Sequence, residues 1–102
     1  MSTVSGGNGH SVWRVLERSS FPYKLAQLSP SEVAAVQRAA LALAAERVLP
    51  ALTDKRDMLP PSWWVYRRHI PEVDLWLLYD VSPKHGTLIL ISVKRSTARF
   101  WF

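Results

Sequence analysis

The sequence predicts an α+β domain in which helices cover one face of a largely antiparallel sheet. A helix-start motif opens a long alanine-rich segment in the middle of the chain, and three segments rich in aromatic and aliphatic residues follow it closely. The short connections between those last segments force neighbouring strands to run antiparallel. Helices followed by strands in this order pack as two layers. The expected order is therefore β-α-α-β-β-β.

The N-terminal part of the chain is expected to hold a tail, a strand and a short helix. Residues 1–10 are polar and glycine-rich, which predicts a flexible tail, and residues 11–102 then form a single domain. The alternation of residues 11–16 predicts a short strand. Residues 21–28 carry apolar side chains loosely on one side, which favours a short helix.

The long helix is predicted from the chemistry of its first turn. Ser29 can cap the helix, and Pro30 stands at the first helical position, where its missing N–H costs nothing. Glu32 can close a capping box by reaching back to the Ser29 amide. The alanine-rich run then favours helix throughout residues 29–49, and Pro50 ends it.

The last third of the chain predicts a three-stranded meander. Residues 53–61 are charged and end in two prolines, so they are expected to form an irregular linker. Strands are expected at residues 62–70, 73–81 and 87–94, which with the first strand make a four-stranded sheet. The aromatic residues 100–102 are expected to dock on the sheet or the long helix, with a partner-binding patch as the alternative.

Composition narrows the class of protein. The 102 residues are 48% hydrophobic, which is enough for a core, and the absence of cysteine leaves no disulfide or thiolate metal site. The chain has no apolar run of about 20 residues and no signal peptide at its start, so a cytoplasmic location without a membrane is expected. A formal net charge of +5 favours nucleic acid, the ribosome or an acidic protein as partner, or serves solubility alone.

Several catalytic constellations are missing from the sequence. Only four glycines occur, and three of them lie in the N-terminal tail, so no phosphate-binding glycine loop is present. The histidines and carboxylates lack metal-ligand spacing, and no serine has a recognisable triad context. We therefore expect no metal and no cofactor.

Cationic and aromatic residues gather instead at the ends of the last three strands. Such residues can cleave RNA without a metal, because cations stabilise the crowded phosphate, a histidine or lysine handles protons, and aromatic rings stack bases. The alternative is that these side chains only solvate strand ends and turns. The set comprises Arg67, Arg68, His69, Lys84, His85, Lys94, Arg95 and Arg99, with the aromatic residues Tyr66, Trp76 and Tyr79.

The order of elements and two motifs resemble the RelE/ParE superfamily of toxins from bacterial type II toxin–antitoxin pairs. The segment KLAQLSPSEV resembles the turn of the family's helical hairpin. The segment LWLLYDVSPKHGTLILISVKRS is similar to the family's pattern of a strand with a tyrosine, a polar turn, an aliphatic strand and a closing basic pair. The resemblance covers about residues 11–95 and implies a RelE-like fold.

The resemblance also implies functional residues. In RelE-like members, basic residues of the middle strands and of the last strand's end cleave mRNA in the ribosomal A site. Arg67 and Arg68 match the former, and Arg95 with Lys94 matches the latter. Tyr79 matches a mainly structural tyrosine. Trp76 stands where many members carry an arginine, and this departure raises the alternative of the ParE-like branch, which acts on DNA gyrase and lacks the nuclease residues.

The sequence therefore leads to one expected function and two alternatives. The expected function is a ribosome-dependent mRNA endonuclease that a cognate antitoxin neutralises, with ribosome and mRNA as further partners. The alternatives are a gyrase-directed toxin and a catalytically silent binding module of the same fold. The C-terminal aromatic residues offer no acid or base, so either His69 or His85 moves protons or the chain is not a nuclease. The expected catalytic residues are Arg67, Arg68, Arg95 and His85, and the expected RNA-binding residues are Lys84, Lys94, Arg99 and Tyr66.

Overall fold

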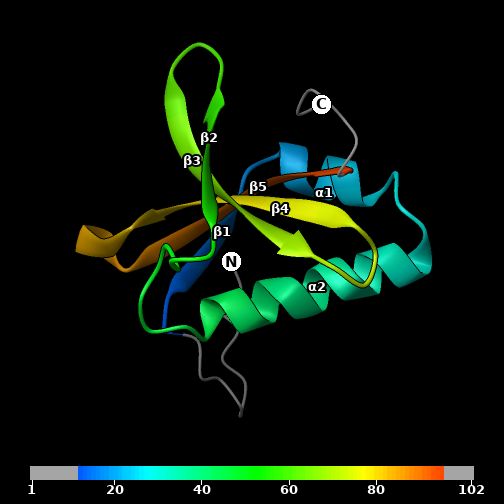
Figure 1. Cartoon of the computed structure of the whole chain (residues 1–102), viewed down its shortest axis with the longest axis horizontal. Helices are drawn as coiled ribbons and strands as arrows, with labels where there is room; N and C mark the ends of the chain where they lie inside the picture. Colours follow the sequence, from blue (N-terminus) through cyan, green and yellow to red (C-terminus); the bar gives the residue numbers. More distant parts are fainter. Residues whose placement is uncertain (1–11, 96–102) are drawn as a thin grey trace.

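Two helices and five strands make up the computed structural model, which describes residues 12–95 (Figure 1). None of its helices is long and apolar enough to cross a membrane. In chain order the elements are β1 (Arg14–Glu17), α1 (Ser20–Leu25), α2 (Pro30–Ala44), β2 (Lys55–Leu59), β3 (Trp63–Ile70), β4 (Leu75–Ser82), the 3₁₀ turn η1 (Pro83–His85) and β5 (Thr87–Arg95).

The strands form one mixed sheet in the order β1-β5-β4-β3-β2. Strands β2 to β5 are a continuous antiparallel meander, and β1 returns to pair in parallel with β5. A parallel pair needs a long crossover, which here includes both helices. The α+β class, the helical pair and the antiparallel meander predicted from the sequence are confirmed.

The linker prediction for residues 53–61 is wrong, because β2 lies within it. Lys55–Leu59 pairs antiparallel with the first half of β3, with Met58 opposite Trp64. The pairing of β3 with β4 begins only at Tyr66, so the first residues of β3 and their β2 partners extend past β4 as an arm (Figure 1). The segment has no strong strand propensity of its own and is held extended by its neighbour. The sheet thus has five strands rather than the expected four.

The predicted start of the long helix is confirmed at the level of single hydrogen bonds. Ser29 Oγ accepts from the Glu32 amide at 3.3 Å, and the Ser29 amide donates to Glu32 Oε1 at 3.0 Å. The helix ends at Ala44, five residues before the expected Leu49. The chain leaves the helix there, and Leu49 is buried in the core.

The sheet has two faces with different surroundings. Residues opposite each other on antiparallel strands point to the same face, and successive residues alternate. The face toward α2 carries Leu75, Leu77 and Tyr79 into the main core, which α1 joins through Phe21. The opposite face, here called the outer face, carries a second, smaller cluster of Val65, Leu78 and Ile91 flanked by Leu59, Trp63 and Ile89. A β-bulge next to Leu78 keeps Ile91 on this side.

Candidate functional site

A group of cations surrounds one indole ring on the outer face. The guanidinium carbon of Arg67 lies 4.6 Å from the centroid of the Trp76 ring. The His69 ring lies 4.7 Å from the same indole, centroid to centroid. Lys94 is opposite Trp76 in the β4–β5 register, so its side chain leaves the sheet on the same face. We call these four residues, Arg67, His69, Trp76 and Lys94, the Trp76 cluster.

Strand alternation explains how these side chains meet. Arg67 and His69 are two residues apart on β3, and His69 is directly opposite Trp76 on β4. Leu75 and Leu77, on either side of Trp76, point into the main core and are fully buried. Because successive side chains of a strand alternate, the Trp76 side chain between these two leucines points to the outer face. A tryptophan there offers its ring face to cations.

Polar contacts around the cluster limit how its members can move. His69 Nε2 lies 3.0 Å from Asp74 Oδ1, which holds the imidazole against the indole. The Nε atom of Arg67 is buried and has no hydrogen-bond partner among residues 12–95. Its charge is therefore stabilised by the Trp76 ring rather than by a carboxylate at that atom. The cluster keeps a positive charge on the surface of the sheet.

A second cation–aromatic pair lies on the outer face. The guanidinium carbon of Arg18, which follows β1, is 4.8 Å from the centroid of the Trp63 ring. Trp63 Nε1 donates a hydrogen bond of 2.9 Å to Asp80 Oδ2, which fixes the indole over β4. Sequence reasoning missed this pair, because Arg18 and Trp63 belong to distant segments that only the sheet brings together.

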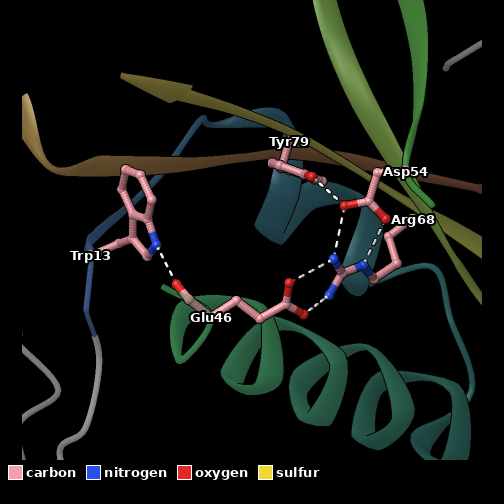
Figure 2. A network of polar contacts seen from close by, with 5 residues as sticks. All are labelled: Trp13, Glu46, Asp54, Arg68 and Tyr79. Carbon is pink, nitrogen blue, oxygen red and sulfur yellow. Dashed lines mark hydrogen bonds and ion pairs between the residues drawn. The ribbon is translucent and has the colours of Figure 1, made fainter. Parts of the chain in front are cut away.

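Arg68, in contrast to its neighbour Arg67, points toward α2 and is held in a polar network (Figure 2). Arg68 Nε and Nη2 donate to the two carboxylate oxygens of Asp54, each at 2.8 Å. Its guanidinium also forms a bidentate ion pair with Glu46, and the Tyr79 hydroxyl donates to Asp54. The Asp54 side chain is 2% exposed and that of Arg68 is 18% exposed. These groups therefore tie the segment before β2 and the end of α2 to the sheet.

The network raises the pKa values of Tyr79 and Arg68. Burial, and then the hydrogen bond that the hydroxyl donates to Asp54, raise the pKa of Tyr79 well above its usual range. Burial by itself would lower the pKa of Arg68, but its bonds to Glu46 and Asp54 outweigh burial and raise that pKa. Arg68 is consequently a permanent cation whose charge is already compensated inside the protein.

Arg95, at the end of β5, pairs with the first turn of α2. Its Nη1 atom lies 2.7 Å from Glu32 Oε2. This bond, followed by the hydrogen bond from the Ser29 amide, lowers the pKa of Glu32 to about 2. Arg95 therefore joins the last strand to the helix cap, on the side of the sheet away from the Trp76 cluster.

The remaining expected site residues lie apart from the Trp76 cluster. Lys84 and His85 are exposed on η1, which follows the end of β4 that is farther from Trp76. His85 Nδ1 is 2.8 Å from Ser82 Oγ. Tyr66 faces α2, with its ring centroid 5.8 Å from that of Tyr79. Arg99 lies outside the described residues. Of the eight expected residues, the structure brings together Arg67 and Lys94, and it adds His69 and Trp76 to them.

The outer face thus presents cations, aromatic rings and one imidazole. Within residues 12–95, no group of three or more histidine or acidic side chains lies close enough to hold a metal ion. Cations beside aromatic rings are suited to bind a polyanion that also has flat faces. The imidazole next to Arg67 can move a proton at a phosphate that the arginine holds.

Comparison with known proteins gives a result at the level of the fold. No protein-family model matches the chain, and no curated protein matches its sequence. Among solved structures, the chain is similar to the archaeal RelE–RelB complex from Pyrococcus horikoshii OT3, at 16% identity and a TM-score of 0.64 over 84% of this chain and 97% of that one. It is also similar to the toxin–antitoxin complex RelBE2 from Mycobacterium tuberculosis, at 22% identity and a TM-score of 0.65 over 84% and 94%. With its helical pair, its antiparallel meander and its parallel β1, the chain has the RelE-like fold.

Proposed function

We propose that this protein is the toxin of a type II toxin–antitoxin pair and a ribosome-dependent endonuclease of mRNA in the cytoplasm. The observation that carries the proposal is the Trp76 cluster, which places Arg67, His69 and Lys94 together on the outer face of a RelE-like fold. The two similar solved structures are toxin–antitoxin complexes, which supports an antitoxin as the partner of this chain.

Each member of the cluster has a role in the proposed cleavage. The 2′-hydroxyl of the message attacks the adjacent phosphate, and the bond from phosphorus to the 5′ oxygen of the next nucleotide breaks, which leaves a 2′,3′-cyclic phosphate and a 5′-hydroxyl. The charge that develops on the phosphate oxygens is stabilised by Arg67 and Lys94. His69, which Asp74 holds against Trp76, moves the proton of the attacking or the leaving oxygen. Arg68 and Arg95 have carboxylate partners in the fold, so in this proposal they support the structure.

The proposed dependence on the ribosome follows because Arg67, Lys94 and His69 do not make up a complete set of catalytic groups. One imidazole cannot act as base and acid at the same moment, and the cluster lies on a strand surface rather than in a deep cavity. A message that the ribosome holds in a strained, extended form would be oriented for attack, whereas free RNA would rarely adopt that geometry. The proposed enzyme therefore cuts message on the ribosome and leaves naked RNA largely intact.

The test is expression of the chain alone in bacteria, with mapping of message 5′ ends after brief induction. We expect growth arrest with cuts within ribosome-bound codons, and relief of both by Arg67→Ala, because the loss of one transition-state cation costs about 100-fold in rate or more. The matched control is Arg56→Ala. Arg56 also lies over an indole, that of Trp64 at 4.6 Å, but on the opposite face of the β2–β3 arm.

The outcomes separate the alternatives. Arrest with intact message and altered plasmid supercoiling would replace the proposal with a gyrase-directed toxin. Arrest that Arg67→Ala leaves unchanged, in a variant whose circular dichroism matches the parent, would remove the Trp76 cluster from the reaction. The absence of arrest, of cuts and of any supercoiling change would leave only a silent binding module.

A further inference from the structure

The two cation–aromatic pairs of the outer face form a repeated arrangement, and the cleavage proposed above uses only Arg67 of one pair. We propose that Arg18–Trp63 and Arg67–Trp76 are two stacking platforms for bases of one single-stranded RNA. On each platform the indole supports the guanidinium from below, and a base stacks on its outer side. This inference rests on the proposed function, for which it names how the substrate is held.

Both platforms point to the same side of the sheet. Trp63 and Arg67 are four residues apart on β3, a spacing that keeps them on one face, and Trp76 joins them from β4. The distances from guanidinium carbon to ring centroid, 4.8 Å and 4.6 Å, are nearly equal. Each cation thus lies within the range in which a ring attracts it and holds it in place.

The platforms are separated by a distance that one strand of RNA can span. Trp63 is hydrogen-bonded to Asp80, which is four residues from Trp76 along β4, or about 13 Å. Between them lie Val65, Leu78 and Ile91, which are buried beneath neighbouring side chains. Two bases of one strand can therefore stack at the two ends, with the intervening nucleotide bridging them.

Two carboxylates of this surface are held in place by hydrogen bonds. Asp80 accepts hydrogen bonds from the Trp63 indole and from the Val81 amide at 2.9 and 2.8 Å. Asp57 on β2 accepts from the Met58 amide at 2.9 Å. These bonds leave both carboxylates ionised, and Arg18, Arg67 and Lys94 supply the positive charge that can attract a phosphate to this face.

The arrangement favours single-stranded RNA over an acidic protein. A carboxylate-rich peptide pairs with the donors at the edge of a guanidinium, and it gains little from the flat face that lies over each indole. A base stacks on a planar surface, and its face is free only when the strand is unpaired. The platforms therefore select unpaired bases, in line with a message read in single-stranded form.

The test is binding of a labelled RNA of about 10 nucleotides, 2′-O-methylated so that it cannot be cut, to the purified full chain. Fluorescence anisotropy gives the dissociation constant. We expect Trp63→Leu and Trp76→Leu each to weaken binding about tenfold. The matched control is Trp64→Leu, since Trp64 is 50% exposed and lies under Arg56 at 4.6 Å, but faces the other way. This control should stay within about twofold of the parent.

A second pair of variants separates stacking from charge and remains informative if a tryptophan variant misfolds. Arg18→Lys and Arg67→Lys keep the positive charge and lose the planar guanidinium. We expect each to weaken binding several-fold. Parent-like binding by both lysine variants would overturn the platforms, as would equal binding of duplex RNA, or a polyglutamate peptide that shows the same pattern across all the variants. The absence of single-stranded RNA binding by the parent would also overturn the inference.

Failure of the inference and failure of the proposed function give different results. If the chain arrests growth and cuts message while the lysine variants bind RNA like the parent, the platforms are wrong and the function stands. If RNA binding depends on both platforms but the chain neither arrests growth nor cuts message, the platforms stand and the function is wrong.

Discussion

Arg67 and Arg68 show how much one residue of offset matters in a strand. Both are arginines of β3, yet the pleat directs Arg67 to the outer face and Arg68 toward α2. Arg67 lies over an indole with its Nε atom unpaired among the described residues, whereas Arg68 binds two carboxylates. The charge of Arg68 is therefore compensated inside the protein, whereas that of Arg67 lies over Trp76 on the outer face.

The raised pKa of Tyr79 predicts a pH dependence of stability. Below pH 10, the phenol is protonated in both the folded and the unfolded protein. Above pH 10, the unfolded chain loses this proton at its usual pKa of 10.0, whereas burial and Asp54 keep it on the folded protein. The contribution of Tyr79 to the free energy of unfolding is therefore present below pH 10 and falls as the pH rises beyond it.

The measurement is urea unfolding between about pH 8 and pH 11. Tyr79→Phe should lower stability by about 1–2 kcal/mol at neutral pH, by loss of the bond to Asp54, and should lose part of the alkaline slope of the parent. The exposed Tyr23 provides the control, since Tyr23→Phe should keep the parental slope. Equal slopes for the parent and Tyr79→Phe would mean that Tyr79 titrates freely in the folded protein.

Among the elements, α2 and β2 differ in what stabilises them. The start of α2 is built from hydrogen bonds within one turn, between Ser29 and Glu32. The edge strand β2 instead depends on pairing with β3, and Asp54, just before it, is anchored through Arg68. Interactions within a turn survive changes elsewhere in the fold, whereas β2 depends on the whole arrangement.

A substitution at the helix cap tests this local contribution. Ser29→Ala removes the side-chain acceptor of the Glu32 amide and should lower the free energy of unfolding by about 1 kcal/mol, with the urea midpoint as the measurement. The control is Ser19→Ala, because Ser19 precedes α1 without any side-chain capping bond. Similar losses for the two variants would show that the capping box adds nothing of its own.

At the scale of the whole molecule, the two faces of the sheet carry different kinds of residues. The face toward α2 holds the main core and the compensated arginines, Arg68 and Arg95. The outer face holds Arg18 and Arg67 over indoles, with Lys94 beside the second indole. With a net charge of +5, the chain thus displays cations where no helix packs among the described residues. Such a surface attracts a polyanion and binds it in a salt-dependent way.

The salt dependence of RNA binding measures how many of these cations contact phosphates. Each phosphate contact to a single strand adds about −0.7 to the slope of log K against log salt, so Arg18, Arg67 and Lys94 together predict about −2. Arg18→Gln should make that slope shallower by about 0.7. Arg38→Gln serves as the control, because Arg38, which lies on α2, is paired with Glu72. A slope near zero for the parent would contradict the electrostatic role of the outer face.

Much of the fold could be predicted from the sequence because its signals are local. The cap of α2 lies within four consecutive residues, 29–32, and the strands β3 and β5 are marked by β-favouring residues between turns. The α+β class and the antiparallel meander follow from the order and spacing of these elements. The early end of α2 at Ala44 and the strand β2 escaped prediction, since neither has a signal of its own.

The partners of the charged residues were decided only by the tertiary structure. Arg68 binds Asp54 and Glu46, 14 and 22 residues away, and Arg95 binds Glu32 across 63 residues. Residue type and spacing select a cationic set, but which of its members is compensated depends on the carboxylates that the fold brings near. The sequence by itself determined the class of the fold and the candidate cations. The strand pleat and the long-range pairing, which no local pattern encodes, determined that Arg67 and Lys94 meet at Trp76 while Arg68 and Arg95 are tied to the helix side.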